Sequence, residues 1–213
     1  MENVKQKWNL KTLFMNYSVY IVLIVLVAYF SLANGDFLST YNVENFLQQI
    51  PPVGILTVAY GMVLICGYVD LSIGYVGMAA GMVGLYTANL GMPAPLVIVI
   101  SLCVGALLGI MNALLIKKFD LPAFILTLGT SYVIKGMLGF FTDEQFIGSE
   151  TEWFSKLAKT PIGTEMIKSN ALIFAIVIII FVFIMNKTRL GKYTYAVGSN
   201  QEAARLSGIN VDL

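Results

Sequence analysis

A single acidic side chain interrupts an otherwise apolar part of the sequence. Asp70 lies in Val69-Asp70-Leu71-Ser72, between two hydrophobic segments. An ionised carboxylate at the centre of a bilayer costs about 2.5–3.5 kcal/mol on insertion scales, so such residues commonly have a function. One interpretation is a tight turn at the inner membrane surface, in which Asp70 or Ser72 caps the next helix. The other, equally consistent with the spacing, is a broken helix whose free backbone groups line a cavity, as in many transporters.

Polar side chains recur in two later apolar segments. Asn112 precedes Lys117 by little more than one helical turn, and it can hydrogen-bond across helices or line a path. Thr127 and Thr130 belong to a polar group in the following segment. Lys135 in that segment either extends toward the outer membrane surface or pairs within the bundle. The sequence therefore places hydrogen-bonding groups inside the membrane.

The residue types exclude several kinds of chemistry. The chain has no histidine and only two cysteines, Cys66 and Cys103, both in apolar runs, so zinc ligation and thiol catalysis lack partner residues. No Gly-x-x-x-x-Gly-Lys-Ser/Thr nucleotide loop occurs, because Gly191-Lys192 is followed by tyrosine. The net charge of +1 gives no indication of nucleic-acid binding. We expect no cofactor, no metal site and no ATP hydrolysis by this chain, and hence no enzyme.

Membrane helices are the elements that must position these residues. The chain is 58% hydrophobic and 12% charged, with a mean hydropathy of +0.80, whereas soluble domains carry roughly 25% charged residues. The sequence therefore predicts an all-α polytopic membrane protein with a single transmembrane domain over residues 1–213. A spanning helix needs about 20 mostly apolar residues, which predicts about six transmembrane helices. These are residues 13–33, 51–69, 71–90, 96–116, 121–141 and 166–185.

The distribution of basic residues predicts the orientation of these helices. Lysine and arginine gather before the first span, between the fourth and fifth, and after the sixth, for example at Lys5, Lys117 and Arg189. Because cytoplasmic loops are enriched in these residues, we expect both termini in the cytoplasm. The long outer loop carries an aromatic pair at 153–154, which either anchors at the membrane interface or contacts an extracytoplasmic partner.

A polar segment, residues 187–213, follows the last predicted span. Asn200 within it is a residue type that caps helix N-termini, and a short amphipathic helix is predicted directly after it. A channel has no need of such an appendage, whereas a membrane protein driven by a soluble partner needs a docking surface in the aqueous phase. The segment therefore predicts a short cytoplasmic coupling helix.

Three stretches in a fixed order give the chain a specific resemblance to a known family. They are Val-Asp-Leu-Ser-Ile-Gly at 69–74, Asn112 with Pro-Ala-Phe-Ile-Leu-Thr-Leu-Gly-Thr at 122–130, and the segment 188–211 with its Ala-Ala-Arg-Leu-Ser-Gly-Ile. Together they resemble the permease subunits of bacterial ATP-binding-cassette importers for monosaccharides, the branch that contains ribose, xylose and galactoside permeases. The resemblance covers nearly the whole chain from about residue 42.

The resemblance implies a function, partners and site residues. It implies that the chain forms the translocation pathway for a ribose-, xylose- or galactose-like sugar in the bacterial plasma membrane. Its partners would be an ATPase subunit that binds the ATP, a second permease copy or homologous permease, and an extracytoplasmic sugar-binding protein. The residues expected to couple to the ATPase are Glu202, Ala203, Ala204, Arg205 and Gly208. The residues expected to line the translocation path are Asp70, Ser72, Asn112, Thr127 and Thr130.

Other functions remain open at this point. Family permeases are longer than 213 residues, so we expect a chain shortened at its C-terminus, as a split gene or a fragment. One alternative is an ion-coupled secondary carrier or channel that uses Asp70 or Lys135 as its coupling site. Another is a truncated fragment that does not transport.

Overall fold

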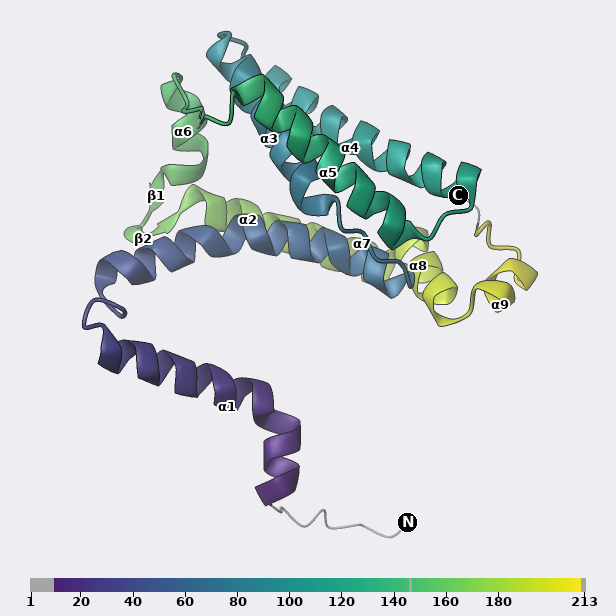
Figure 1. Cartoon of the computed structure of the whole chain (residues 1–213), viewed down its shortest axis with the longest axis horizontal. Coiled ribbons are helices and arrows are strands. Elements are labelled where there is room, and N and C mark those ends of the chain that lie inside the picture. The colour runs from purple at the N-terminus through teal and green to yellow at the C-terminus, as the bar shows by residue number, and fades with distance from the viewer. Residues whose placement is uncertain (1–9, 146, 212–213) are drawn as a thin grey trace. The chain divides into compact units, whose positions relative to one another are not determined.

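The computed structural model describes residues 10–145 and 147–211, with side chains from Tyr17 onward. In these ranges the chain is helical apart from loops and one two-stranded hairpin (Figure 1). It divides into two compact units, Met1–Leu47 and Gln48–Leu213, which are described separately. Lys5, used for the predicted orientation, and the end of the predicted coupling segment at 212–213 lie outside the described residues.

The first unit contains helix α1 (Leu10–Ala33), a turn and the beginning of helix α2 (Thr40–Ile65). Phe37 in the turn stacks on Phe30 with ring centroids 5.7 Å apart, and it packs edge-on against Phe46 at 6.2 Å. These aromatic contacts fix the turn between the two helices.

Helix α2 begins and ends earlier than its predicted span, 51–69. It starts at Thr40 and includes two prolines in its interior. Residues 40–50 are helical, but they are too polar for hydropathy to recognise them as part of a span. It ends at Ile65 because Gly67 has a φ of 86°, and the N–H groups of Gly67 and the next residue bond back to carbonyls of the last turn. The residues that follow, which the sequence assigned to the same helix, are irregular.

Helices α3 (Ile73–Asn89), α4 (Ala94–Phe119) and α5 (Ala123–Thr142) form the densest part of the second unit (Figure 1). Helix α3 packs against both α4 and α5. Its approach to α4 depends on Gly84, because any side chain there would overlap the hydroxyl of Ser101. In lipid, such close backbone contacts supply the attraction that the hydrophobic effect supplies in water.

The predicted outer loop contains regular structure. It forms helix α6 (Glu152–Lys159) and a hairpin of β1 (Pro161–Ile162) and β2 (Thr164–Lys168), and helix α7 (Ser169–Lys187) follows directly. The predicted span 166–185 is therefore wrong at its start, because its first residues belong to the hairpin.

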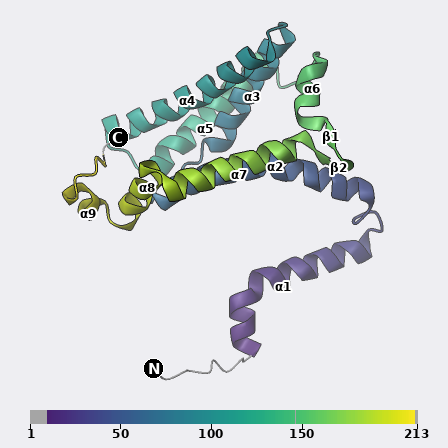
Figure 2. The same cartoon turned by 180° about the vertical axis from the view of Figure 1, so that it is seen from behind.

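Helix α7 lies beside the second part of α2 (Figure 2). The Asn170 side-chain amide donates to the Gln48 carbonyl at 3.0 Å. One turn further on, the ring of Phe174 occupies the space that a side chain at Gly54 would need. Helices α2 and α7 are thus held together by one hydrogen bond and by the close contact of Phe174 with Gly54.

Within the described residues, four helices are long and apolar enough to span a membrane: α2, α4, α5 and α7. Helix α3 has 17 residues, and a further apolar stretch, Tyr17–Ala33, lies in α1. Each predicted span thus overlaps an apolar helix. The predicted class, an all-α polytopic membrane protein, is confirmed.

Two short helices, α8 (Arg189–Ser199) and α9 (Gln201–Leu206), follow α7. Asn200 caps α9, since its Oδ1 accepts from the Ala203 N–H at 2.9 Å, so the predicted cap is confirmed. Helix α8 was not predicted, because it contains two glycines, which are poor helix formers, and no long apolar run.

Candidate functional site

The irregular chain between α2 and α3 is held by two side chains of α5. The Leu71 N–H donates to Thr127 Oγ1 at 3.0 Å, and Ser131 Oγ donates to the Leu71 carbonyl at 2.7 Å. Thr127 and Ser131 are one helical turn apart on the same face, with 1% and 4% of their surfaces exposed. Their hydroxyls thus replace the hydrogen bonds that Leu71 would make within a helix.

Asp70 and Ser72 form a second set of bonds beside Leu71. Asp70 Oδ1 accepts from the Ser72 N–H at 2.7 Å and from the Ser72 hydroxyl at 2.6 Å. Asn112 of α4 donates through Nδ2 to Ser72 Oγ at 2.8 Å. Each donor in this chain polarises the next, which strengthens the bond to the carboxylate. We call the residues of both sets the Asp70 cluster: Asp70, Leu71, Ser72, Asn112, Thr127 and Ser131.

The Asp70 cluster lies well inside the helix layer. Asn112 precedes the end of α4 at residue 119 by seven residues, and Ser131 follows the start of α5 at residue 123 by eight. At 1.5 Å per residue these separations are about 10 and 12 Å from the neighbouring ends of the two helices. Irregular backbone at such depth is tolerated when protein groups satisfy it, as they do at Leu71. These positions support the broken-helix interpretation.

The capping bond that the other interpretation, a surface turn, would contain is not formed among the described residues. Ser72 occupies the N-cap position of α3, but its side chain makes no capping bond. The Asp70 carboxylate is bonded to Ser72 itself rather than to the first turn of α3.

Not every polar group near the Asp70 cluster takes part in its hydrogen bonds. Thr130, a predicted path residue, bonds to the Leu126 carbonyl of its own helix at 3.1 Å and stands apart from the cluster. Asn112 Oδ1 is buried and has no hydrogen-bond partner among the described residues. Ser131 was not predicted as a site residue, although its spacing of four from Thr127 places both on one helix face.

Helix α8 packs against the end of α2, where the irregular segment begins. A side chain at Gly198 would overlap the Ile65 carbonyl, so this contact requires glycine. The Cys66 thiol donates to the Thr194 carbonyl at 3.9 Å. At the other end of α8, a side chain at Gly191 would overlap the backbone of Met185 near the end of α7. Helix α8 is therefore fixed to two membrane helices.

Helix α9 exposes most of the predicted coupling residues. Glu202, Ala203 and Arg205 are exposed, whereas Ala204 faces inward with 4% of its surface exposed. Gly208 has a φ of 80°, and the next N–H bonds to the Ala204 carbonyl at 3.1 Å, which is a glycine C-cap. A short helix with charged and small residues on its outer side results, and its docking role stays a prediction.

The fold and the site together define the class of protein to which the chain belongs. In its described part the chain is a multi-pass integral membrane protein with an irregular segment between α2 and α3 and two short helices after α7. A family model described as the permease component of a branched-chain amino acid transport system matches residues 42–213. The chain therefore belongs to this family of permeases, and it is a multi-pass protein of the inner membrane.

The chain is also similar to curated sugar permeases. It is 32% identical to the ribose import permease of Haemophilus influenzae, over 100% of this chain and 66% of that protein. It is 31% identical to the galactose/methyl galactoside import permease of Escherichia coli, over 92% and 63%. It is 28% identical to the fructose import permease of Rhizobium meliloti, over 90% and 55%.

The similarity confirms the resemblance to permeases of monosaccharide importers. The chain spans between 55% and 66% of the lengths of these three relatives. No solved structure matches the chain.

Proposed function

We propose that this chain is the membrane subunit of an ATP-driven importer that carries a monosaccharide. The observation that carries the proposal is the extent of the similarity: permeases for ribose, galactose or methyl galactoside, and fructose each match 90% or more of this chain. A neutral sugar is recognised by a few well-placed hydrogen-bonding groups in a mostly apolar site. The hydroxyl, amide and carboxylate groups of the Asp70 cluster are of this kind.

ATP would be bound and hydrolysed by a separate subunit that docks on α9, so the chain itself would need no cofactor. Ala203 and Gly208 leave little between the helix backbone and a partner, and Glu202 and Arg205 offer charges at the rim of the contact. Ala204, which faces inward, would act by packing α9 against its own chain. The exposure of α9 supports this role.

Movement of α9 would reach the Asp70 cluster through a short series of direct contacts. Asn200 caps α9 and directly follows α8. Gly198 of α8 packs on Ile65, and the irregular segment leads from there to Leu71, which is held by α5. Rigid helices joined by such contacts move as bodies, which suits alternating access.

Within the cluster, Asp70 is the residue best placed to contact the sugar. Both of its bonds to Ser72 use Oδ1, and the residue is only half-buried. Oδ2 would then accept from a sugar hydroxyl. Ser72, Asn112 and Thr127 would border the path and hold this carboxylate, and Thr130 would border the path at the next turn of α5.

The complete importer would contain further subunits. A second permease copy or a homologous permease would complete the pathway, and a sugar-binding protein would deliver substrate from outside. These partners are what the resemblance to ATP-binding-cassette importers implies, and the word import in the names of the relatives supports the inward direction of transport.

Uptake by the source cells tests the proposal. Deleting the gene should abolish uptake of one of labelled ribose, galactose or fructose, and the unchanged gene should restore it. Labelled leucine is the matched control, because the family description names branched-chain amino acids. Loss of leucine uptake with all sugar uptake intact would contradict the proposal.

A further inference from the structure

Lys135 places a charged group within the spanning helix α5. It precedes the end of α5 at Thr142 by seven residues, about 10 Å, and it is exposed. Lysines within spanning helices rarely face lipid; they face a water-filled cavity or the protein interior. The side of α5 that carries Lys135 therefore suits an aqueous path better than a lipid contact.

The side of α5 next to Lys135 is already occupied. Thr127, Ser131 and Ile134 follow helical spacing and are buried, and the first two hold Leu71. Lys135 lies outside this buried stripe, so its ammonium group is not part of the Asp70 cluster.

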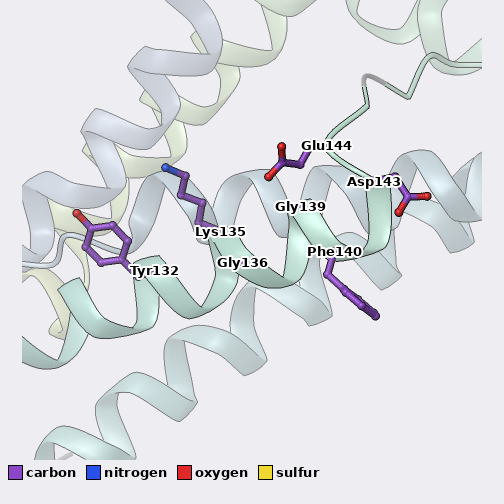
Figure 3. A pocket seen from close by; sticks show the side chains of 7 residues that line it. All are labelled: Tyr132, Lys135, Gly136, Gly139, Phe140, Asp143 and Glu144. Carbon is purple, nitrogen blue, oxygen red and sulfur yellow. The ribbon is translucent and has the colours of Figure 1, made fainter.

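A hollow of about 440 Å³ opens around Lys135 on the exposed side (Figure 3). Its floor is the helix backbone at Gly136 and Gly139. A Cβ built on Gly136 would have no neighbouring atom within 4 Å, so the space above the backbone is open. Tyr132 forms one end of the hollow.

The chain reversal after α5 brings a carboxylate to the same hollow. Asp143 and Glu144 have φ values of 49° and 57°, and the Glu144 Cγ lies 3.7 Å from the position of a Cβ on Gly139. In Figure 3, Lys135 and Glu144 extend from the same side of α5, and Phe140 and Asp143, which also line the hollow, extend in other directions. An ammonium group, two carboxylates and two aromatic rings therefore border one space.

We propose that this hollow, bordered by Tyr132, Lys135, Gly136, Gly139 and Glu144, is a binding site for a neutral monosaccharide on the translocation path. The ammonium group donates to sugar hydroxyls and the carboxylate accepts from them. The Tyr132 ring covers an apolar face of the sugar. The inference rests on the proposed function, and it adds a site separate from the Asp70 cluster.

The charges and the size of the hollow suit a small ligand without net charge. Lys135 attracts an anion but Asp143 and Glu144 repel it, and the reverse holds for a cation; among ligands without net charge, a sugar rather than a zwitterion follows from the proposed function. The volume lies within the range of small-molecule sites, about 300–1,000 Å³, and the bare backbone at the glycines permits close approach.

Uptake kinetics of the complete transporter test the site. Lys135→Met keeps the aliphatic stem but removes the three donors, and Glu144→Gln removes the charge at constant size. Each should raise the KM for the transported sugar by about tenfold or more while the maximal rate changes little. Phe141→Leu is the matched control, because Phe141 is 73% exposed on the same helix and does not border the hollow; its KM should equal that of the wild type.

Chemical labelling gives a second measurement that does not depend on transport rate. In a Lys135→Cys variant, a water-soluble thiol reagent should modify the new cysteine, and saturating sugar should slow the modification. The wild-type chain, with Cys66 and Cys103, reports the background. An unreactive Cys at this position would place it against lipid and overturn the inference.

The two proposals fail in different ways. If the wild-type transporter takes up no monosaccharide, the proposed function fails. If the wild type transports a sugar and both Lys135→Met and Glu144→Gln have its KM, the site alone is wrong. Equal labelling of Lys135→Cys with and without saturating sugar leads to the same conclusion about the site.

Discussion

At the scale of single residues, the broken helix depends on the hydroxyls that bind Leu71. Thr127→Val keeps the side-chain volume but leaves the Leu71 N–H without its acceptor, at an expected cost of about 1 kcal/mol in the free energy of unfolding. Thr130→Val is the matched control, because that hydroxyl bonds only within its own helix. Thermal unfolding in detergent should show a lower Tm for Thr127→Val, by about 2–4 °C for each kcal/mol. Equal Tm values for the two variants would contradict this account.

Asp70 has two roles that a pair of substitutions separates. Asp70→Asn retains an oxygen that can accept both bonds from Ser72, so the fold should persist, whereas Asp70→Ala removes the acceptor and leaves the Ser72 N–H unpaired. We expect Asp70→Asn to reduce uptake by about tenfold with a Tm near that of the wild type, because a charged acceptor binds hydroxyls more strongly than a neutral one. Asp70→Ala should lower both uptake and Tm. Normal uptake by Asp70→Asn would show that the carboxylate charge is not used in transport.

The sequence predicted single residues well where the cause is local. Asn200 was recognised as a helix cap because the pattern of a cap extends over only a few residues. The bond between Asn112 and Ser72 joins residues 40 positions apart, and the bond between Thr127 and Leu71 joins residues 56 apart. Such contacts depend on how α3, α4 and α5 pack, which hydropathy does not specify.

At the scale of elements, helix α8 is the connection between the exposed helix α9 and the membrane helices. Gly198→Ala adds a methyl group where the Ile65 carbonyl already lies, so α8 must move away from α2. We expect ATP hydrolysis by the assembled importer to continue while sugar uptake falls by about tenfold or more, because the contact that transmits movement is lost.

A second glycine substitution provides the control for this prediction. Gly109→Ala lies in α4, where a Cβ would meet no atom within 4 Å, so uptake should be unchanged and stability should rise by about 0.5–1 kcal/mol. ATP hydrolysis and sugar uptake are measured in parallel for Gly198→Ala and Gly109→Ala. Full uptake by Gly198→Ala would exclude α8 as the transmitting element.

The positions of the apolar helices were predictable, but several of their ends were not. Hydropathy detects the apolar part of α2 and misses its polar beginning at residues 40–50. The start of α7 was wrong because residues 164–168 pair in a hairpin, and pairing between strands is not visible in hydropathy. Helix α8 has no strong local signal, since its position comes from contacts at Gly191 and Gly198.

At the scale of the whole molecule, most of the apolar helix surface faces outward. Only 6% of the apolar windows of α2, α4 and α7 is buried within the chain. This surface is available to lipid and to other membrane helices, which agrees with the proposed pairing with a second permease.

Association with the ATPase is a prediction at this scale. The double variant Glu202→Lys with Arg205→Glu reverses both exposed charges of α9 while leaving Ala204, which faces inward, unchanged. Reversed charges at an interface repel a complementary partner, so we expect the ATPase to be lost on co-purification and uptake to fall with it. If the ATPase still co-purifies and uptake persists, α9 is not the docking helix.

The central claim is that ATP hydrolysis by a partner drives uptake of a monosaccharide through this chain. The most direct measurement uses proteoliposomes that contain the complete importer, with labelled sugar and the sugar-binding protein outside. The account predicts accumulation of sugar only when ATP is enclosed, and no loss of accumulation when a protonophore dissipates the proton gradient. Accumulation driven by an imposed ion gradient without ATP would contradict it and identify a secondary carrier.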